Sequence, residues 1–159
     1  MSKVVYMNVL ADSLQRKYSI LQSILELTKK QEVLLKEETF DETEFLKTIS
    51  DKQVFINKME ELDNGFEAIY TRVKSELETS REQYQNEIKK MQQLITQVTE
   101  LGIDIEALEK RNKVQMDKVL INRKQKIKDL RMNNTVANSY YRNMANHQYN
   151  QSYFLDRKK

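Results

Sequence analysis

The stretch that decides the fold is residues 82–131, which read EQYQNEIKKMQQLITQVTELGIDIEALEKRNKVQMDKVLINRKQKIKDLR. Apolar residues recur in it at steps of three and four, which predicts an amphipathic helix and not a strand. The stripe comprises Tyr84, Ile88, Met91, Ile95, Val98, Leu101, Ile105, Leu108, Met116, Leu120, Ile127 and Leu130. A helix with this stripe exposed would not be stable alone, so we expect the preceding residues to cover it.

A glycine interrupts the regular spacing of this helix. Strict alternation of four- and three-residue steps from Tyr84 would place Gly102 in the stripe after Val98. An interior glycine costs about 1 kcal/mol relative to alanine. We therefore expect the register to slip at residues 101–103, with a bend or a broken turn there.

The composition is typical of long helices. The chain has 159 residues, of which 32% are charged, with no Pro, no Trp, no Cys and two Gly. This length suits one domain, and this composition suits a helical bundle or coiled coil. The absence of Cys excludes disulfides and thiolate chemistry, and it fits a reducing compartment.

Two further helices are predicted before the long one, over residues 4–38 and 42–78. Both carry apolar stripes with helical spacing, and the first stripe is wide enough to contact two neighbours. The second stripe is interrupted at residues 63–65 but resumes in phase, which favours a kinked continuous helix over two short ones. With the third helix over 81–131, we expect residues 1–132 to form an all-α, elongated antiparallel three-helix bundle or coiled coil.

The boundary between the first two helices has a strong local signal. Asp41 is a good N-cap, and Glu44 stands where the capping box requires an acidic residue. Phe40 and Phe45 have the spacing of a hydrophobic staple. The short connection makes the first two helices antiparallel.

The third helix is predicted to be longer than the other two, so roughly 20 Å of it should overhang the hairpin. The overhang runs from Asp117 to Arg131, and its apolar residues have no evident partner within the chain. Such surface usually marks a protein interaction site. It also predicts that the free protein forms a homodimer through Leu120, Ile127 and Leu130.

Residues 133–159 are predicted to be a loosely structured tail, rich in Asn and Tyr. Its aromatic residues either bind a partner or fold back on the bundle, and the sequence leaves both open. Residues 111–159 hold 12 basic and 3 acidic side chains, whereas residues 1–110 hold 15 and 21. The basic block is a solvated face or attracts an acidic client; nucleic-acid binding is not expected, because no recognised motif for it is present.

Catalytic chemistry is not expected. His147 is the only His, and no Cys or carboxylate cluster near it would form a metal site. The two Gly are isolated, so there is no phosphate-binding loop. We expect no enzyme activity, no cofactor, no metal and no membrane insertion, since no apolar run approaches about 18 residues. The N-terminus lacks a signal-peptide core, so we expect a cytoplasmic protein.

Five segments carry a family resemblance: LDNGF at 62–66, MQQLI at 91–95, LEKRNK at 108–113, SYYRNM at 139–144 and FLDRKK at 154–159. Together with the helical layout, they resemble the FlgN-type flagellar export chaperones, clostridial members in particular. The resemblance covers nearly the full chain. It implies a cytoplasmic chaperone that holds hook–filament junction proteins before export through its C-terminal part, with contacts to export apparatus components.

The residues expected to bind this cargo lie in the last third of the chain. They are Met116, Val119, Leu120, Ile127, Leu130, Tyr140, Tyr141, Tyr149, Tyr153 and Phe154. We expect an amphipathic segment of the client to pack on them and complete the bundle. The alternative is a structural coiled-coil or scaffold protein with no export role, which requires only the apolar stripes.

Overall fold

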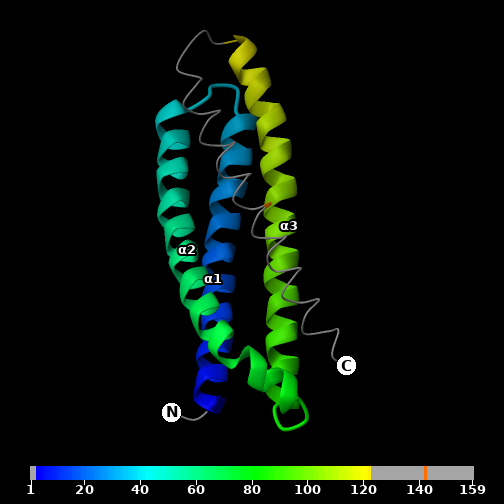
Figure 1. Cartoon of the computed structure of the whole chain (residues 1–159). Coiled ribbons are helices and arrows are strands. Elements are labelled where there is room, and N and C mark those ends of the chain that lie inside the picture. Colours follow the sequence, from blue (N-terminus) through cyan, green and yellow to red (C-terminus); the bar gives the residue numbers. More distant parts are fainter. Residues whose placement is uncertain (1–2, 123–141, 143–159) are drawn as a thin grey trace.

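The computed structural model describes residues 3–122 and Arg142. The described residues form three helices and no strand: α1 (Lys3–Lys36), α2 (Glu42–Thr79) and α3 (Gln85–Asn122). The helices run up, down and up along one another in an elongated bundle (Figure 1). The predicted all-α three-helix bundle is therefore confirmed.

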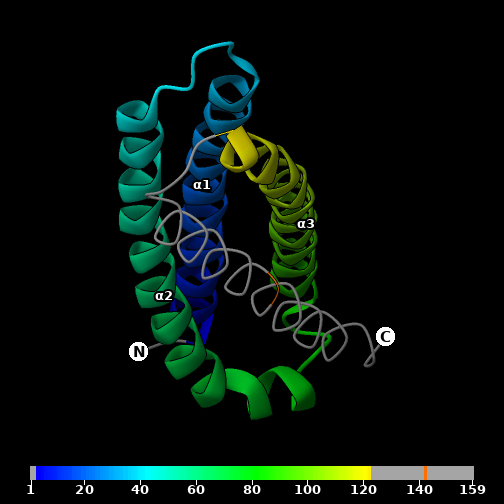
Figure 2. The ribbon, with the colours of Figure 1, turned by 90° about the horizontal axis from the view of Figure 1, so that it is seen from above.

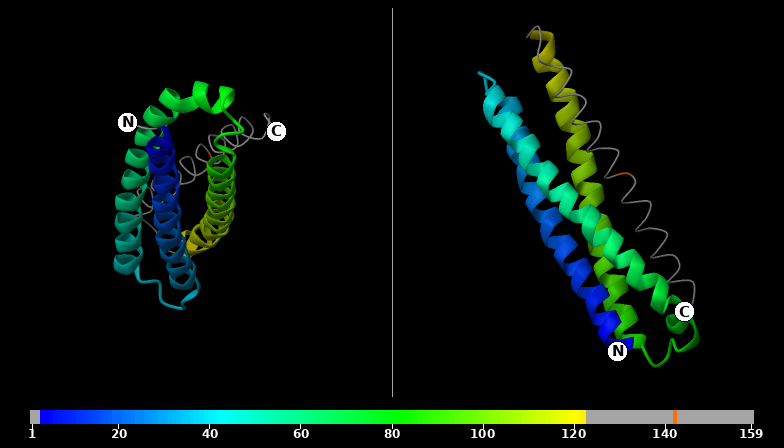
Figure 3. Two further views of the ribbon diagram at one scale, coloured as in Figure 1. Left: turned by 90° about the horizontal axis from the view of Figure 1, so that it is seen from below. Right: turned by 60° about the vertical axis from the view of Figure 1, so that its left-hand side comes forward.

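Helix α1 is the central helix of the described bundle. It packs against both α2 and α3, whereas the Cα traces of α2 and α3 stay more than 8 Å apart over their described lengths. Figures 2 and 3 show α1 between the other two helices when the bundle is viewed from above and from below. The wide stripe on α1 serves this purpose, because it has a neighbour on each flank.

The first turn forms as its local sequence predicts. The Asp41 side chain accepts a hydrogen bond from the Glu44 backbone N–H at 3.1 Å, which caps α2. The rings of Phe40 and Phe45 lie 5.3 Å apart between centroids, so the staple also forms.

The second turn ends later than predicted. Residues 80–84 form a turn in which the N–H groups of Gln83 and Tyr84 donate to Ser80 O at 3.0 and 3.3 Å. Helix α3 therefore begins at Gln85 and not at residue 81. Tyr84 is buried in this turn, which anchors the connection in the core.

Helix α3 does not slip at its glycine. The buried positions of α3 and of the turn before it follow strict four- and three-residue steps: Tyr84, Ile88, Met91, Ile95, Val98, Gly102, Ile105, Glu109, Asn112 and Met116. The predicted register slip and broken turn at residues 101–103 are therefore wrong, because α3 is one continuous helix. Tolerating a glycine costs about 1 kcal/mol, which is less than rotating Ile105 and Met116 out of the core would cost.

Helix α2 is continuous through Gly65, as predicted. A side chain at this position would meet no atom within 4 Å, so packing does not require a glycine here. The last third of α2 bends toward the start of α3 (Figures 1 and 2).

Three apolar clusters follow one another along the bundle axis. The first joins the start of α1 to the end of α2 and the start of α3, around Leu10, Val73 and Met91. The second lies at mid-height around Leu21 and Met59. The third closes the end of the bundle at which α1 turns into α2.

Candidate functional site

The third cluster lies where the sequence predicts cargo binding, and we call it the end cluster. Its buried members are Leu34, Leu35, Phe40, Phe45 and Met116, with Ile49, Val119 and Leu120 packed against them and partly buried. It is built from the last turn of α1, the loop, the first turns of α2 and the last described turns of α3. The capped and stapled turn holds the two Phe rings in place beneath α3.

This arrangement corrects part of the prediction for α3. Met116 is 1% exposed, so it belongs to the core and is not free to bind cargo. Val119 and Leu120 are half-buried against the same cluster, so they do have partners within the chain. Ile121, in contrast, is 84% exposed. An unpartnered apolar surface is thus found only at Ile121 among these residues.

The remaining predicted cargo-binding residues lie outside the described residues. They are Ile127, Leu130, Tyr140, Tyr141, Tyr149, Tyr153 and Phe154. The homodimer through Leu120, Ile127 and Leu130 also stays a prediction.

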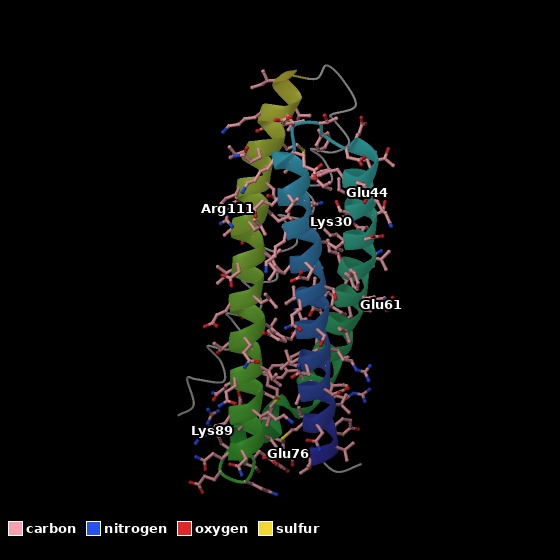
Figure 4. The ribbon with its side chains drawn as sticks, turned by 180° about the vertical axis from the view of Figure 1, so that it is seen from behind. Lys30, Glu44, Glu61, Glu76, Lys89 and Arg111 are labelled. Carbon is pink, nitrogen blue, oxygen red and sulfur yellow. The ribbon has the colours of Figure 1, made fainter. Side chains whose placement is uncertain are left out.

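A shallow groove of about 220 Å³ opens beside the end cluster. Its walls are Leu35, Glu37, Glu38, Phe40, Gln115, Lys118 and Val119. The lining is more polar than apolar: Leu35, Phe40 and Val119 contribute apolar surface, and two glutamates of the loop, Gln115 and one lysine of α3 contribute polar surface. A lining that mixes apolar and charged side chains suits an amphipathic peptide. Nearby, Lys30 Nζ lies 3.1 Å from Glu44 Oε2, and this pair joins α1 to α2 on the surface (Figure 4).

A buried polar layer separates the end cluster from the second cluster. It consists of Thr28 and Gln31 on α1, Thr48 and Lys52 on α2, and Glu109 and Asn112 on α3, each at most 3% exposed. Lys52 Nζ donates to Glu109 Oε1 and, at 3.0 Å, to Gln31 Oε1. Gln31 Nε2 in turn donates to Thr48 Oγ1 at 3.0 Å. The layer thus ties α1, α2 and α3 together at one height.

The polar groups that α3 contributes to this layer form only part of their possible hydrogen bonds. Asn112 Nδ2 donates to Thr28 O at 3.0 Å, and Thr28 Oγ1 lies 3.4 Å from Glu109 Oε1. Glu109 Oε2 and Asn112 Oδ1 are buried and have no hydrogen-bond partner among the described residues. Burial lowers the pKa of Lys52 to about 7, because the ammonium group loses its hydration. The polar layer is therefore a costly section of the core.

A second buried cation lies lower in the bundle. Lys17 is 2% exposed, and its Nζ lies 2.6 Å from Asp63 Oδ1, so it links α1 to α2 between the first and second clusters. Burial lowers the pKa of Lys17, and the neighbouring Asp63 carboxylate partly offsets this effect. Asp63 is 26% exposed, so water still reaches its carboxylate.

Sequence analysis did not identify the polar layer. Its members interrupt the apolar stripes, so a search for apolar residues passes over them. A usable signal exists nonetheless: Glu109 and Asn112 continue the four- and three-residue steps of α3, and Thr28 and Gln31 continue those of α1. Polar residues in phase with a core stripe predict a buried polar layer.

Searches of the described residues for a metal site and for a membrane-spanning helix found neither. The described residues contain no group of three His, Cys, Asp or Glu side chains placed to hold a metal ion. No helix over residues 3–122 has the length and hydropathy to cross a membrane. Comparisons with protein-family models, with curated proteins and with solved structures found no match.

Proposed function

We propose that this protein is a cytoplasmic export chaperone of the FlgN type, which holds flagellar hook–filament junction proteins through the end of the bundle and the residues that follow α3. One observation carries the proposal. A groove of mixed apolar and charged lining borders the end cluster, and Ile121, near the end of α3, is 84% exposed. We infer that an amphipathic helix of a client packs against this end.

The charges at this end fit a helical client. Glu37 and Glu38 of the loop and Lys118 of α3 all line the groove, so a client helix can pair with both signs of charge. The segment resemblance to the chaperone family supports the same function. The scaffold alternative is less well supported, because α1 already covers the seam of α3 within the chain.

Calorimetric titration of the full chain with a purified junction protein tests the proposal. Burying an isoleucine side chain contributes about 1.5–3 kcal/mol, so Ile121→Ser should weaken binding about 10- to 100-fold. Ile103→Ser is the matched control, since Ile103 lies on the same helix and is 52% exposed but is remote from the groove. It should leave the affinity unchanged.

Either of two results would reject the proposal. The first is that the intact chain does not bind any junction protein, and the second is that both isoleucine variants bind as tightly as the intact chain. The second result would move the binding site away from the end of the bundle.

A further inference from the structure

A second groove opens between α1 and α2, away from the end cluster. Its volume is about 360 Å³, larger than that of the groove beside the end cluster. Its lining runs from Val9 to Arg16 on α1 and from Glu61 to Ile69 on α2, so each wall is about two helical turns long, or about 10–12 Å. We call it the Gly65 groove, because Gly65 lies at the middle of its α2 wall.

The lining of the Gly65 groove is mainly apolar. Leu10 and Phe66 are buried members of the first cluster, so the groove reaches down to the core. Leu62 is half-buried, and Val9 is 43% exposed at the edge of the α1 wall. Apolar surface that extends from the core to an exposed edge is typical of a site that binds an amphipathic helix.

The shape of the groove is fixed by contacts within the bundle. The ring of Phe66 stacks on that of Tyr70, with 5.8 Å between centroids and 15° between planes. The buried pair of Lys17 and Asp63, with 2.6 Å between Nζ and Oδ1, joins the two walls, and each of these residues directly follows a lining residue in the sequence. The groove is therefore preorganised, which lowers the cost of binding.

Gly65 keeps the groove open. It is exposed in the interior of α2, where a Cβ atom would meet no other atom within 4 Å. Glycine is less favourable in a helix interior than every residue except proline, so neither α2 nor the packing of the chain gains from it. Gly102 differs, because it is buried within the stripe of α3. A glycine on an open helix face allows another backbone to approach closely.

The lining carries one charge that has no partner. On the α1 wall, Arg16 Nε lies 3.0 Å from Asp12 Oδ2, so these two charges offset each other. On the α2 wall, Glu61 forms no ion pair with any described residue. Lys58, one turn before it, lies with its Nζ 5.6 Å from the centroid of the Phe55 ring. A complementary partner therefore places a basic side chain beside Glu61.

We propose that the Gly65 groove binds a basic amphipathic helix of another protein. The apolar face of that helix packs on Phe66, its backbone passes close to Gly65, and a lysine or arginine pairs with Glu61. Residues 1–122 hold 18 basic and 22 acidic side chains, so the net charge of the bundle also attracts a basic partner. The groove and the end cluster lie at different heights of the bundle, so this inference does not depend on the chaperone function.

Fluorescence anisotropy with synthetic peptides tests the proposal on the full chain. The probe is a labelled amphipathic peptide of leucine and lysine, about 18 residues long so that it can form a helix on contact. Its counterpart has glutamate in place of each lysine. The lysine peptide should bind at least about tenfold more tightly. Absence of binding, or equal affinity for the two peptides, would overturn the proposal.

Gly65→Met fills the groove without disturbing α2. Methionine has a higher helix propensity than glycine, and its flexible side chain can enter the open groove, so the melting temperature should not fall. Affinity for the lysine peptide should fall about 10- to 100-fold, as expected when one apolar side chain is no longer buried. The control is Asn64→Met, at the adjacent exposed position outside the groove. Asn64→Met and, at the other end of the bundle, Ile121→Ser should leave the affinity unchanged. Unchanged affinity in Gly65→Met, or an equal loss in Asn64→Met, would overturn the proposal.

Charge reversal tests the role of Glu61. Glu61→Lys should weaken binding of the lysine peptide about two- to fivefold, as expected for an exposed ion pair. Glu60→Lys makes the same change in net charge at an exposed position outside the groove and is the control. Equal effects of the two variants would reject the pairing with Glu61.

Sedimentation velocity of the chain without peptide tests a second copy as the occupant. The proposal expects Gly65→Met to leave the oligomeric state unchanged. A dimer that Gly65→Met dissociates would show that the groove binds another copy of the chain, and the basic partner would be wrong.

Discussion

The buried ion pair of Lys52 and Glu109 can be removed one member at a time, and we begin with Lys52→Met. Methionine has a similar length and fits the same space without the charge. The variant leaves Glu109, which is 0% exposed, without a good donor to Oε1 among the described residues. The Thr28 hydroxyl lies 3.4 Å away, and it already donates to Ile24 O at 2.7 Å. Gln31 also loses the donor to its Oε1.

The expected magnitude follows from this geometry. Removing one partner of a buried pair costs about 3–5 kcal/mol, because the other charge remains buried and uncompensated. For a chain of this size, that loss lowers the melting temperature by roughly 6–20 °C. Replacing both partners with apolar residues of similar volume is neutral or stabilising by about 1–4 kcal/mol. The double variant Lys52→Met, Glu109→Leu should therefore be at least as stable as the unaltered chain.

Urea unfolding followed by circular dichroism at 222 nm measures the free energies of unfolding of the single and double variants at one pH. Equal slopes with urea among the variants would show that the exposed surface on unfolding has not changed. Lys47→Met is the control, since Lys47 is an exposed lysine of α2, and it should change stability by less than about 0.5 kcal/mol. A double variant as unstable as the single one, or a single variant within 1 kcal/mol of the unaltered chain, would refute the buried, dry character of the polar layer.

Three further predictions concern single groups. Burial lowers the pKa of Lys52 from its ordinary value of 10.5 to about 7, so between pH 7 and 10.5 the unfolded chain binds more protons than the folded chain. The free energy of unfolding, relative to that of Lys52→Met, should therefore rise with pH across this window by up to about 1.4 kcal/mol per pH unit. A difference between the two chains that does not change with pH in urea titrations would contradict this. Asp41→Ala removes the cap on the Glu44 N–H and should cost about 1 kcal/mol in thermal unfolding, whereas Asp41→Asn should cost little. Lys17→Met should cost less than Lys52→Met in the same urea assay, because water can hydrate the Asp63 carboxylate that is left behind.

The first turn and the continuity of α2, both of which local sequence determines, were predicted correctly. The cap of Asp41 on Glu44 and the staple of Phe40 and Phe45 each join residues at most five positions apart, so their spacing alone specifies the contact. The continuity of α2 also followed from its own stripe, which resumes in phase after Gly65. Local signals of this kind do not depend on the arrangement of the other helices.

Two of the errors concern contacts between distant residues. Lys52 and Glu109 are 57 positions apart, so neither helix alone shows that its charge is paired in the core. The expected lack of partners for Val119 and Leu120 came from comparing helix lengths as straight rods. Helix α3 begins four residues later than predicted, so Val119 and Leu120 lie about 6 Å less far along the bundle than expected. Phe40 also extends the core beyond the end of α1.

The polar layer gives the end of the bundle a degree of independence from the rest. Apolar contact is continuous within each cluster, but between the second cluster and the end cluster the three helices meet through Gln31, Lys52 and Glu109. These groups fix the register of the helices, because any shift would leave a buried charge unpaired. They contribute little net stability, so the turns beyond them can open without unfolding the rest of the bundle. Under the proposed chaperone function, local opening of this end on a bundle of fixed register would let the chain hold a client helix and later release it.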